Sequence, residues 1–384
     1  MITEGIKFLN FKKRINIKKT KQNLNLILSE KNQVIQSLSK DYKISFKKKI
    51  INKYKKNLNF RVIGMGGSTL GSQTIYNFLE KKIKKNFWFE DNLQNTTKKI
   101  NNKNIVNLVI SKSGNTIETI VNSNILIKKE NKNIFITENK KNYLYLLAQK
   151  LKAEIIQHNN YIGGRYSVLS EVGMVPAELM GLKSENFRQL NLLIKNKQFI
   201  NSLIANVNST LFFIKNKKYN SIIINYDEKS ENLFKWYQQL VAESLGKKNT
   251  GLLPIVSNMP KDNHSVMQLY LDGFKNNFFT FFYVHDQNSK KINNKTIFNS
   301  HKYLKNKNLS NIIYGQKRAT ENIFKLKNIP FRSFEIYKRD EKTLGELFTF
   351  FILETILLGK ALNLNPYDQP AVELIKKETK KLLV

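Results

Sequence analysis

Short apolar runs alternate with amphipathic stretches from about residue 60 onward. In the first half of the chain, apolar runs of strand length lie at residues 60–65, 87–89, 105–110, 133–137 and 154–156. Stretches with helical spacing separate them at residues 72–85, 116–129 and 141–152. Strand, helix and strand in this order are typical of parallel βαβ units, so we predict an α/β domain here.

The same alternation resumes in the second half. Strands are predicted at residues 221–225, 278–284 and 331–336, and helices at residues 231–245, 265–273 and 344–362. The divide falls in the helical region 186–215, and residues 288–307 are predicted to form a polar loop. We therefore expect a helical lead-in at residues 1–55, a first α/β domain at 56–200 and a second α/β domain with C-terminal helices at 201–384.

The composition fits a folded protein without cysteine chemistry. Hydrophobic residues make up 41% of the 384 residues, which is enough to bury a core. The sequence contains no cysteine, which excludes disulfides, thiolate zinc sites and a cysteine nucleophile. Residues 1–14 lack the apolar core and cleavage site of a secretory signal, so we expect a cytoplasmic protein. Glu346, Glu354 and Lys360 interrupt the most apolar stretch, which we interpret as a buried helix and not a membrane span.

The net charge is high and comes mainly from lysine. Lysine and arginine number 65 against 29 acidic residues, a formal charge of +36. A basic surface can bind nucleic-acid phosphates, so nucleic-acid binding is an alternative function class. Base recognition favours the bidentate arginine fork, however, and arginine occurs only at positions 14, 61, 165, 188, 318, 332 and 339. Because the lysines are spread along the whole chain among Asn and Ile, we interpret them as solvated faces and expect no specific nucleic-acid partner.

A glycine-rich turn follows the first predicted strand and precedes a helix. Its sequence at residues 64–71 is Gly-Met-Gly-Gly-Ser-Thr-Leu-Gly, which includes Gly67 and Ser68. Free backbone N–H groups at a helix start favour an anion, so a phosphate or sugar site is one interpretation and a ligand-free turn is the other. A dinucleotide fingerprint would need Gly in place of Thr69, and the sequence has no Walker Gly-Lys-Ser/Thr ending.

A second turn of the same kind follows the next predicted strand. Ser111, Lys112, Ser113 and Thr116 place hydroxyl groups at a helix start, where they can cap the helix or bind a phosphate. In an open parallel sheet the carboxyl ends of the strands meet at one edge, so the two turns converge on one crevice. We infer that the first domain binds a small anionic ligand.

Two more candidates suit charge stabilisation and proton transfer. Arg165 follows Gly163-Gly164, where the backbone can approach a ligand and a cation can neutralise developing negative charge. Gln239 and Glu243 are four residues apart and share one face of a predicted helix, and a carboxylate beside an amide suits a positioned base. An exposed helix with ordinary polar residues is the alternative for this pair.

The last candidates lie farther along the chain. His264 stands at a predicted helix start, where it could exchange a proton, although a cap or a packed side chain is the alternative. Gln369 and Lys376 lie about two helical turns apart, on one face if residues 365–376 form a helix. An amphipathic terminal helix without a catalytic role is the alternative for that segment.

Taken together, these blocks resemble the phosphoglucose isomerase family. The run at residues 163–175 and the two earlier turns first carry the likeness, and the blocks around Glu243, His264 and Lys376 follow in the family's order. The resemblance spans residues 64–376. It implies two sugar isomerase (SIS) domains, a homodimer with shared active sites, and interconversion of glucose 6-phosphate and fructose 6-phosphate through a cis-enediol. No cofactor or metal is implied.

The resemblance also implies a role for each candidate residue. Glu243 is expected to move the proton between C1 and C2, and Arg165 to steady the enediolate. Two residues are expected to open the sugar ring, Lys376 of the same chain and His264 of the partner subunit. The backbone N–H of Lys112 is expected to help bind the phosphate, in the same cleft as Gln239 and Gln369. The side chains expected to contact the phosphate are those of Ser68, Ser111, Ser113 and Thr116, with Gly67 in the first turn.

The sequence departs from the usual family pattern beside several matched positions. The N-terminal helical region is trimmed, Gly114-Asn115 stands between the phosphate contacts, and Pro370-Ala371 follows Gln369. These changes replace no matched residue, but they leave open a dual-specificity phosphoglucose/phosphomannose isomerase. A non-catalytic sugar-phosphate-binding SIS protein is a further alternative, although such a binder would not need Glu243, His264 and Lys376 together.

Overall fold

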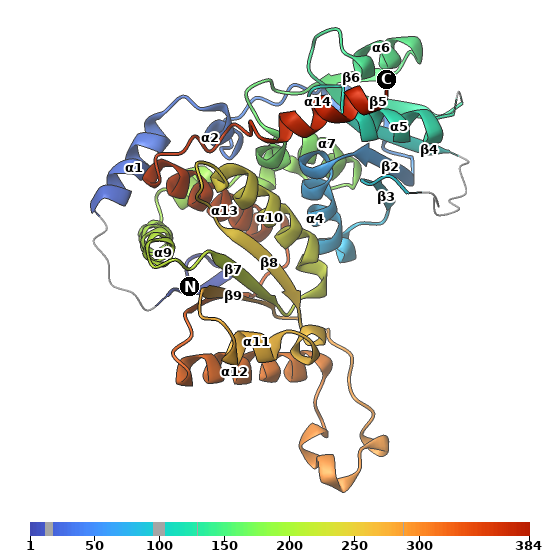
Figure 1. The fold of residues 1–384 in the computed structure, drawn as a ribbon. Coiled ribbons are helices and arrows are strands. Elements are labelled where there is room, and N and C mark those ends of the chain that lie inside the picture. Colours follow the sequence, from blue (N-terminus) through green and yellow to red (C-terminus); the bar gives the residue numbers. More distant parts are fainter. Residues whose placement is uncertain (12–17, 95–103, 129, 287) are drawn as a thin grey trace.

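Two five-stranded sheets, one above the other and flanked by helices, form the framework of the molecule (Figure 1). The computed structural model describes residues 1–11, 18–94, 104–128, 130–286 and 288–384 of the chain. All described strand pairs are parallel except one, so the predicted α/β class with mainly parallel sheets is confirmed. Arg14 and Lys129, the last residue of a predicted helix, lie outside the described residues.

The first sheet follows the predicted alternation closely. Its strand order is β3-β2-β4-β5-β6, with strands β2 (Asn59–Gly64), β3 (Asn86–Glu90), β4 (Ile105–Ile110), β5 (Lys132–Thr137) and β6 (Glu154–Gln157). The helices between and after them are α4 (Leu70–Phe78), α5 (Ile117–Leu126), α6 (Tyr143–Lys150) and α7 (Glu171–Leu179). Every residue of β4 is buried, because helices cover both faces of a parallel sheet.

The second sheet repeats this order with one antiparallel edge. Its order is β1-β10-β9-β7-β8, with strands β1 (Ile6–Leu9), β7 (Asn220–Asn225), β8 (Leu253–Asn258), β9 (Asn277–Val284) and β10 (Phe331–Ile336). Its helices are α9 (Lys197–Lys215), α10 (Glu231–Leu245), α11 (Met267–Asp272), α12 (Leu309–Leu326) and α13 (Glu341–Ala361). The pattern analysis did not predict β8 or α12. Pro254 in β8 and the charged, polar face of α12 hide both from a search for apolar runs.

The lead-in contains a strand that the pattern analysis missed. Residues 6–9 were expected in a helical lead-in, but they form β1, which pairs antiparallel with β10 from Ile6 opposite Ile336 to Leu9 opposite Ser333. Four residues are too few for a periodic signal, and the pairing partner lies more than three hundred residues away. The short helices α1 (Lys18–Ser29), α2 (Gln33–Ser37) and α3 (Lys48–Tyr54) agree with the helical expectation for the rest. The boundaries at residues 55/56 and 200/201 stay predictions.

The main core lies between the sheets, where α4, α10 and α13 pack together (Figure 1). Every residue of α13 from Thr343 to Gly359 is buried, including both of its central carboxylates. Glu354 pairs with the buried guanidinium of Arg332, and Glu346 accepts a hydrogen bond from Thr3 Oγ1 at 2.6 Å. This helix therefore lies in the core, as predicted, and its two buried carboxylates have polar partners. No helix among the described residues is long and apolar enough to cross a membrane.

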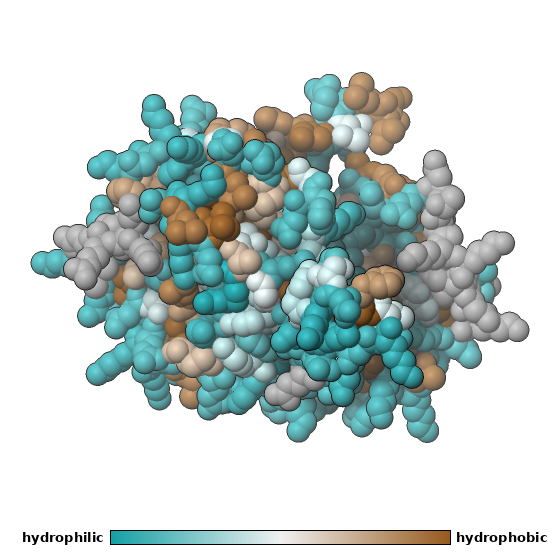
Figure 2. Space-filling model, turned by 90° about the horizontal axis from the view of Figure 1, so that it is seen from below, coloured by the Kyte–Doolittle hydropathy of each residue, from teal (hydrophilic) through white to brown (hydrophobic). Residues whose placement is uncertain are grey.

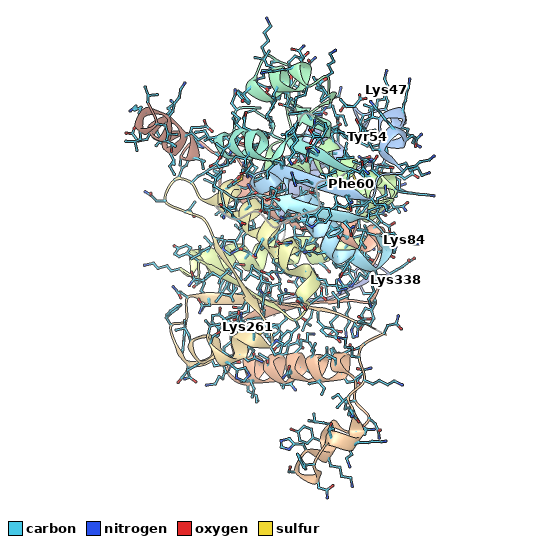
Figure 3. The ribbon with its side chains drawn as sticks, turned by 90° about the vertical axis from the view of Figure 1, so that its right-hand side faces the viewer. Lys47, Tyr54, Phe60, Lys84, Lys261 and Lys338 are labelled. Atoms are coloured by element: carbon cyan, nitrogen blue, oxygen red, sulfur yellow. The ribbon has the colours of Figure 1, made fainter. Side chains whose placement is uncertain are left out.

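The predicted polar loop projects from the body. Between β9 and α12 the described residues include two short 3₁₀ turns, Asn294–Thr296 and Asn299–Leu304, and this stretch extends below the second sheet in two perpendicular views (Figures 1 and 3). The face seen from below is mostly hydrophilic, with hydrophobic residues in small separate patches (Figure 2). This distribution agrees with lysines that serve as solvated side chains.

Candidate active site

The two glycine- and serine-rich turns lie side by side at the carboxyl ends of β2 and β4. The first forms a 3₁₀ turn, η1 (Gly66–Ser68), directly after β2. In the second, the Ser111 and Thr116 hydroxyls lie 2.9 Å apart where α5 begins. Because β2 and β4 are adjacent parallel strands, both turns open toward the same side. The predicted convergence of the two turns is confirmed.

Glycine is needed in the first turn because another turn packs directly against it. A 3₁₀ helix, η3 (Gly164–Leu169), carries Arg165, and a Cβ on Gly67 would lie 2.2 Å from the carbonyl carbon of Gly164. Real Cβ atoms do not approach a carbonyl carbon so closely. The absence of a side chain at Gly67 therefore brings Arg165 next to the two turns.

The second turn is braced by the loop that follows β5. Gly114 has φ of +65°, and a Cβ there would meet Asn142 Oδ1 at 1.8 Å. The same Asn142 oxygen accepts a hydrogen bond from the backbone of Tyr145 and so caps α6. A glycine between the expected phosphate contacts therefore lets two helix starts meet at the site.

Arg165 is buried and makes hydrogen bonds with all five of its N–H groups. Nε donates to Ser244 Oγ at 2.8 Å, and one terminal nitrogen donates to Glu243 Oε2 at 3.2 Å and to Gln369 Oε1 at 2.7 Å. The other donates to the backbone oxygens of Pro366 at 2.7 Å and Asp368 at 2.9 Å. One guanidinium thus joins α10 to the segment before the C-terminal helix.

Glu243 is held from two sides. Its Oε1 accepts a hydrogen bond from Gln239 Nε2 at 2.9 Å, one helical turn earlier on α10, and its Oε2 faces Arg165. The shared helix face predicted for these two residues is confirmed. Gln239 Oε1 is buried and has no partner among the described side chains and backbone. The pair therefore presents a fixed carboxylate and one unused acceptor.

These residues line one open, polar cleft of about 370 Å³. The cleft brings together every predicted site residue except His264: Gly67, Ser68, Ser111, Lys112, Ser113, Thr116, Arg165, Gln239, Glu243, Gln369 and Lys376. It is large enough for a small ligand, and its contacts come from both halves of the chain.

His264 lies elsewhere. It ends the 3₁₀ turn η6 (Lys261–His264) after β8, it is exposed, and it does not line the cleft. Lys261, the first residue of that turn, marks its place low on the second domain in Figure 3. The histidine therefore faces solvent beyond the cleft of its own chain.

The C-terminal candidates differ from the expected geometry. Gln369 and Lys376 were predicted on one helix face, but the helix α14 begins only at Val372, so Gln369 precedes it. Pro370 explains the difference, because proline disfavours helical backbone at the residue before it. Both side chains still reach the cleft, and Lys376 pairs with Glu373 at 2.6 Å.

Sequence reasoning missed several residues of the cleft, of which Glu138 is the most informative. Glu138 directly follows β5 and pairs with Lys140 at 2.8 Å and with Lys112 at 3.9 Å. Burial lowers the pKa of Lys112, and Glu138 partly offsets this effect. Its position after the strand next to β4 is the signal that could have revealed it. The other missed lining residues are Met65, Tyr367, Asp368 and Glu373, whereas Gly163 and Gly164 line the cleft beside Arg165 as expected.

Comparisons with known proteins identify the family of this chain. The model of the family described as phosphoglucose isomerase matches residues 31–383. This chain belongs to the phosphoglucose isomerase family. Within the family, it is similar to the glucose-6-phosphate isomerase of Methanocaldococcus jannaschii, with 32% identity over 358 residues that cover 86% of this chain and 85% of that protein.

Two solved structures superpose over nearly the whole chain. A glucose-6-phosphate isomerase from Chlamydia trachomatis matches with a TM-score of 0.75 at 14% identity, over 99% of this chain and 89% of that one. A hypothetical protein from Thermus thermophilus matches with a TM-score of 0.83 at 20% identity, over 96% and 94%. The likeness confirms the expected fold of two sugar isomerase domains.

Proposed function

We propose that the protein interconverts D-glucose 6-phosphate and D-fructose 6-phosphate without a cofactor. The observation that carries the proposal is the placement of Glu243, a carboxylate held by two donors, in a cleft whose other wall is two hydroxyl-rich turns. A positioned base and an anchor for a phosphate are what aldose–ketose isomerisation of a sugar phosphate requires. Family membership supports the same activity.

In this proposal the phosphate binds at the two turns. The hydroxyls of Ser68, Ser111, Ser113 and Thr116, with the backbone N–H of Lys112, would contact its oxygens near the start of α5, where the helix dipole favours an anion. Lys112 and Lys140 offset the charge of Glu138 at the edge of the cleft. Anchoring one end of a flexible open-chain sugar orients C1 and C2 toward Glu243.

Glu243 is the proposed base. It takes the proton from C2 of the open-chain aldose and returns it to C1, while the proton on O2 moves to O1, so the ketose forms with no net gain or loss of electrons. Arg165 carries a permanent positive charge beside the reacting carbons. Its N–H groups already donate to protein acceptors, so it stabilises the enediolate by its charge and not by a direct hydrogen bond. Gln239 Nε2 holds the Glu243 carboxylate in place for this step.

Ring opening involves Lys376 and a second copy of the chain in the same proposal. His264 is exposed and lies outside its own cleft, so a homodimer in which it enters the partner's cleft would complete the site. The projecting loop, with Phe298 and Tyr303 exposed by 82% and 68%, offers apolar surface for such an association. The proposal places this enzyme in the cytoplasm.

A coupled assay tests the proposal directly. Fructose 6-phosphate is supplied, glucose 6-phosphate is detected, and the Glu243→Gln variant is compared with the wild-type protein. We expect the variant to lose about 10²–10⁴-fold in turnover, because an amide cannot accept the proton. Binding should persist, since the new amide can still accept from Arg165 and donate to Gln239 Oε1 after that side chain turns.

The other outcomes separate the alternatives. Wild-type activity in the variant would reject Glu243 as the base. Turnover of mannose 6-phosphate as well would indicate dual specificity. If neither protein turns over but a sugar phosphate raises the melting temperature of both, the chain is a non-catalytic sugar-phosphate-binding protein.

A further inference from the structure

The segment at residues 365–369 leads from the core toward α14 (Val372–Leu382), a helix that has no buried residue. In two perpendicular views α14 lies at the outside of the molecule, and it projects from the body in Figure 3 (Figures 1 and 3). Packing therefore contributes little to the position of Lys376. The attachments of the segment 365–369, called here the clamped segment, must largely set that position.

One attachment is a chain of hydrogen bonds with a single direction. Arg165 Nε can only donate and the backbone oxygen of Pro366 can only accept, and two hydroxyls lie between them. Ser244 Oγ therefore accepts from Arg165 at 2.8 Å and donates to the Tyr166 hydroxyl at 2.8 Å, which donates to the Pro366 oxygen at 2.9 Å. Each hydroxyl donates once and accepts once, and the guanidinium charge polarises the series.

The second attachment is Lys247. This lysine follows Gly246, which ends α10, and a tight turn pairs its backbone with Thr250. Its side chain is 12% exposed, and its ammonium donates to Asp368 Oδ1 at 2.6 Å and to the backbone oxygen of Asn365. Asn365 Nδ2 in turn donates to the other Asp368 oxygen at 3.0 Å. Two ends of the clamped segment are thus tied to the helix that carries Glu243.

We propose that Lys247 is a positioning residue that, with the Ser244–Tyr166 hydroxyl pair, fixes the clamped segment and so places Gln369 and Lys376 relative to Glu243. The inference rests on the proposed function and assigns proton transfer and ring opening to parts of the molecule that are held in place differently. Arg165 and Glu243 belong to the core, whereas the residue expected to open the ring follows the clamped segment, which this clamp holds together with the direct hydrogen bonds from Arg165 to Pro366, Asp368 and Gln369. Loosening the clamp should therefore harm ring opening more than proton transfer between C1 and C2.

Lys247→Met tests the inference, with Lys248→Met as the matched control. Both variants lose one lysine charge, but Lys248 is the exposed neighbour and has no place in the clamp. We compare fructose 6-phosphate with its 5-deoxy analogue, which lacks the hydroxyl that closes the furanose ring and enters as an open chain. For Lys247→Met we expect kcat on fructose 6-phosphate to fall roughly ten- to a hundredfold, with a clearly smaller fall on the analogue.

Three further measurements make the outcome decisive. Amide hydrogen exchange in residues 364–371 should accelerate in Lys247→Met and not in Lys248→Met. Lys247→Arg should recover most of the kcat, and Asp368→Asn, at an exposed position, should reproduce a weaker form of the defect. Equal losses on both substrates, or unchanged exchange, would overturn the inference. Wild-type protein without turnover would instead contradict the proposed function, while the exchange data would still report on the clamp.

Discussion

The two sheets share one strand order, yet among the described residues the cleft lined by glycine- and serine-rich turns lies at the centre of the first sheet. In each, the first strand of the unit pairs on both sides, β2 with β3 and β4, and β7 with β8 and β9. This arrangement leaves a crevice at the carboxyl ends where successive connections diverge. In the first domain that crevice contains the Gly64–Ser68 and Ser111–Thr116 turns.

In the second domain the protein's own ion pairs occupy the corresponding place. Asp227, two residues after β7, accepts hydrogen bonds from Arg339 at 2.5 Å and from Ser230 Oγ at 2.5 Å. Asp286, two residues after β9, pairs with Lys81 of the first domain at 3.0 Å. The strand order therefore forms a crevice in both domains. The side chains of the two loops decide whether that crevice is open to a ligand or is filled by ion pairs within the protein.

Of the substitutions that test this difference between the two crevices, Gly67→Ala should have the largest effect. The added methyl group meets the Gly164 backbone, and such overpacking costs about 1–3 kcal/mol, which corresponds to binding weaker by a factor of about 5–150 if it falls on the bound state. We expect a raised KM for fructose 6-phosphate and a lower melting temperature. Gly315→Ala is the control, since nothing lies within 4 Å of the new methyl group on exposed α12. An unchanged KM in Gly67→Ala would show that the two turns need not meet closely.

Ser113→Ala should have an intermediate effect. A hydrogen bond to a charged group contributes about 1.5–3 kcal/mol, so loss of this hydroxyl should raise the KM for sugar phosphate. Lys112→Ala should change the KM less, because its backbone N–H remains and its ammonium lies near Glu138. Ser230→Ala, in the second crevice, should leave the KM unchanged. The opposite order for Ser113 and Lys112 would reject the backbone role of Lys112.

Arg339→Met should have the smallest effect on catalysis. The variant keeps an aliphatic stem but loses the guanidinium, which lies over the Phe78 ring and pairs with the half-buried Asp227. Urea unfolding should show a free energy of unfolding lower by about 1–3 kcal/mol, with the KM for fructose 6-phosphate unchanged. A KM that moves as far as in Ser113→Ala would mean that the second crevice takes part in substrate binding.

Much of the site could be predicted because its signals are local. The Ser111–Thr116 and Gly64–Ser68 turns are recognisable from residue types next to apolar strands, and the spacing of Gln239 and Glu243 requires only a helix. Glu138 was missed although it follows a predicted strand, because a carboxylate is not expected in a phosphate cleft until Lys112 and Lys140 are seen beside it. The helix predicted through Gln369 is wrong because of Pro370. The sequence already shows this proline, which disfavours helical backbone at the residue before it, but the prediction followed the spacing of Gln369 and Lys376 instead.

The sequence by itself determined the alternation of strands and helices and the glycine and serine turns, because side-chain periodicity and backbone freedom act within a few residues. Only the tertiary structure decided three other features. These are the pairing of β1 with β10, the five acceptors of Arg165 drawn from α10 and the clamped segment, and the exposure of His264 outside its own cleft. Each depends on contacts between residues far apart in the chain, which exist only once the two sheets have packed around the shared core.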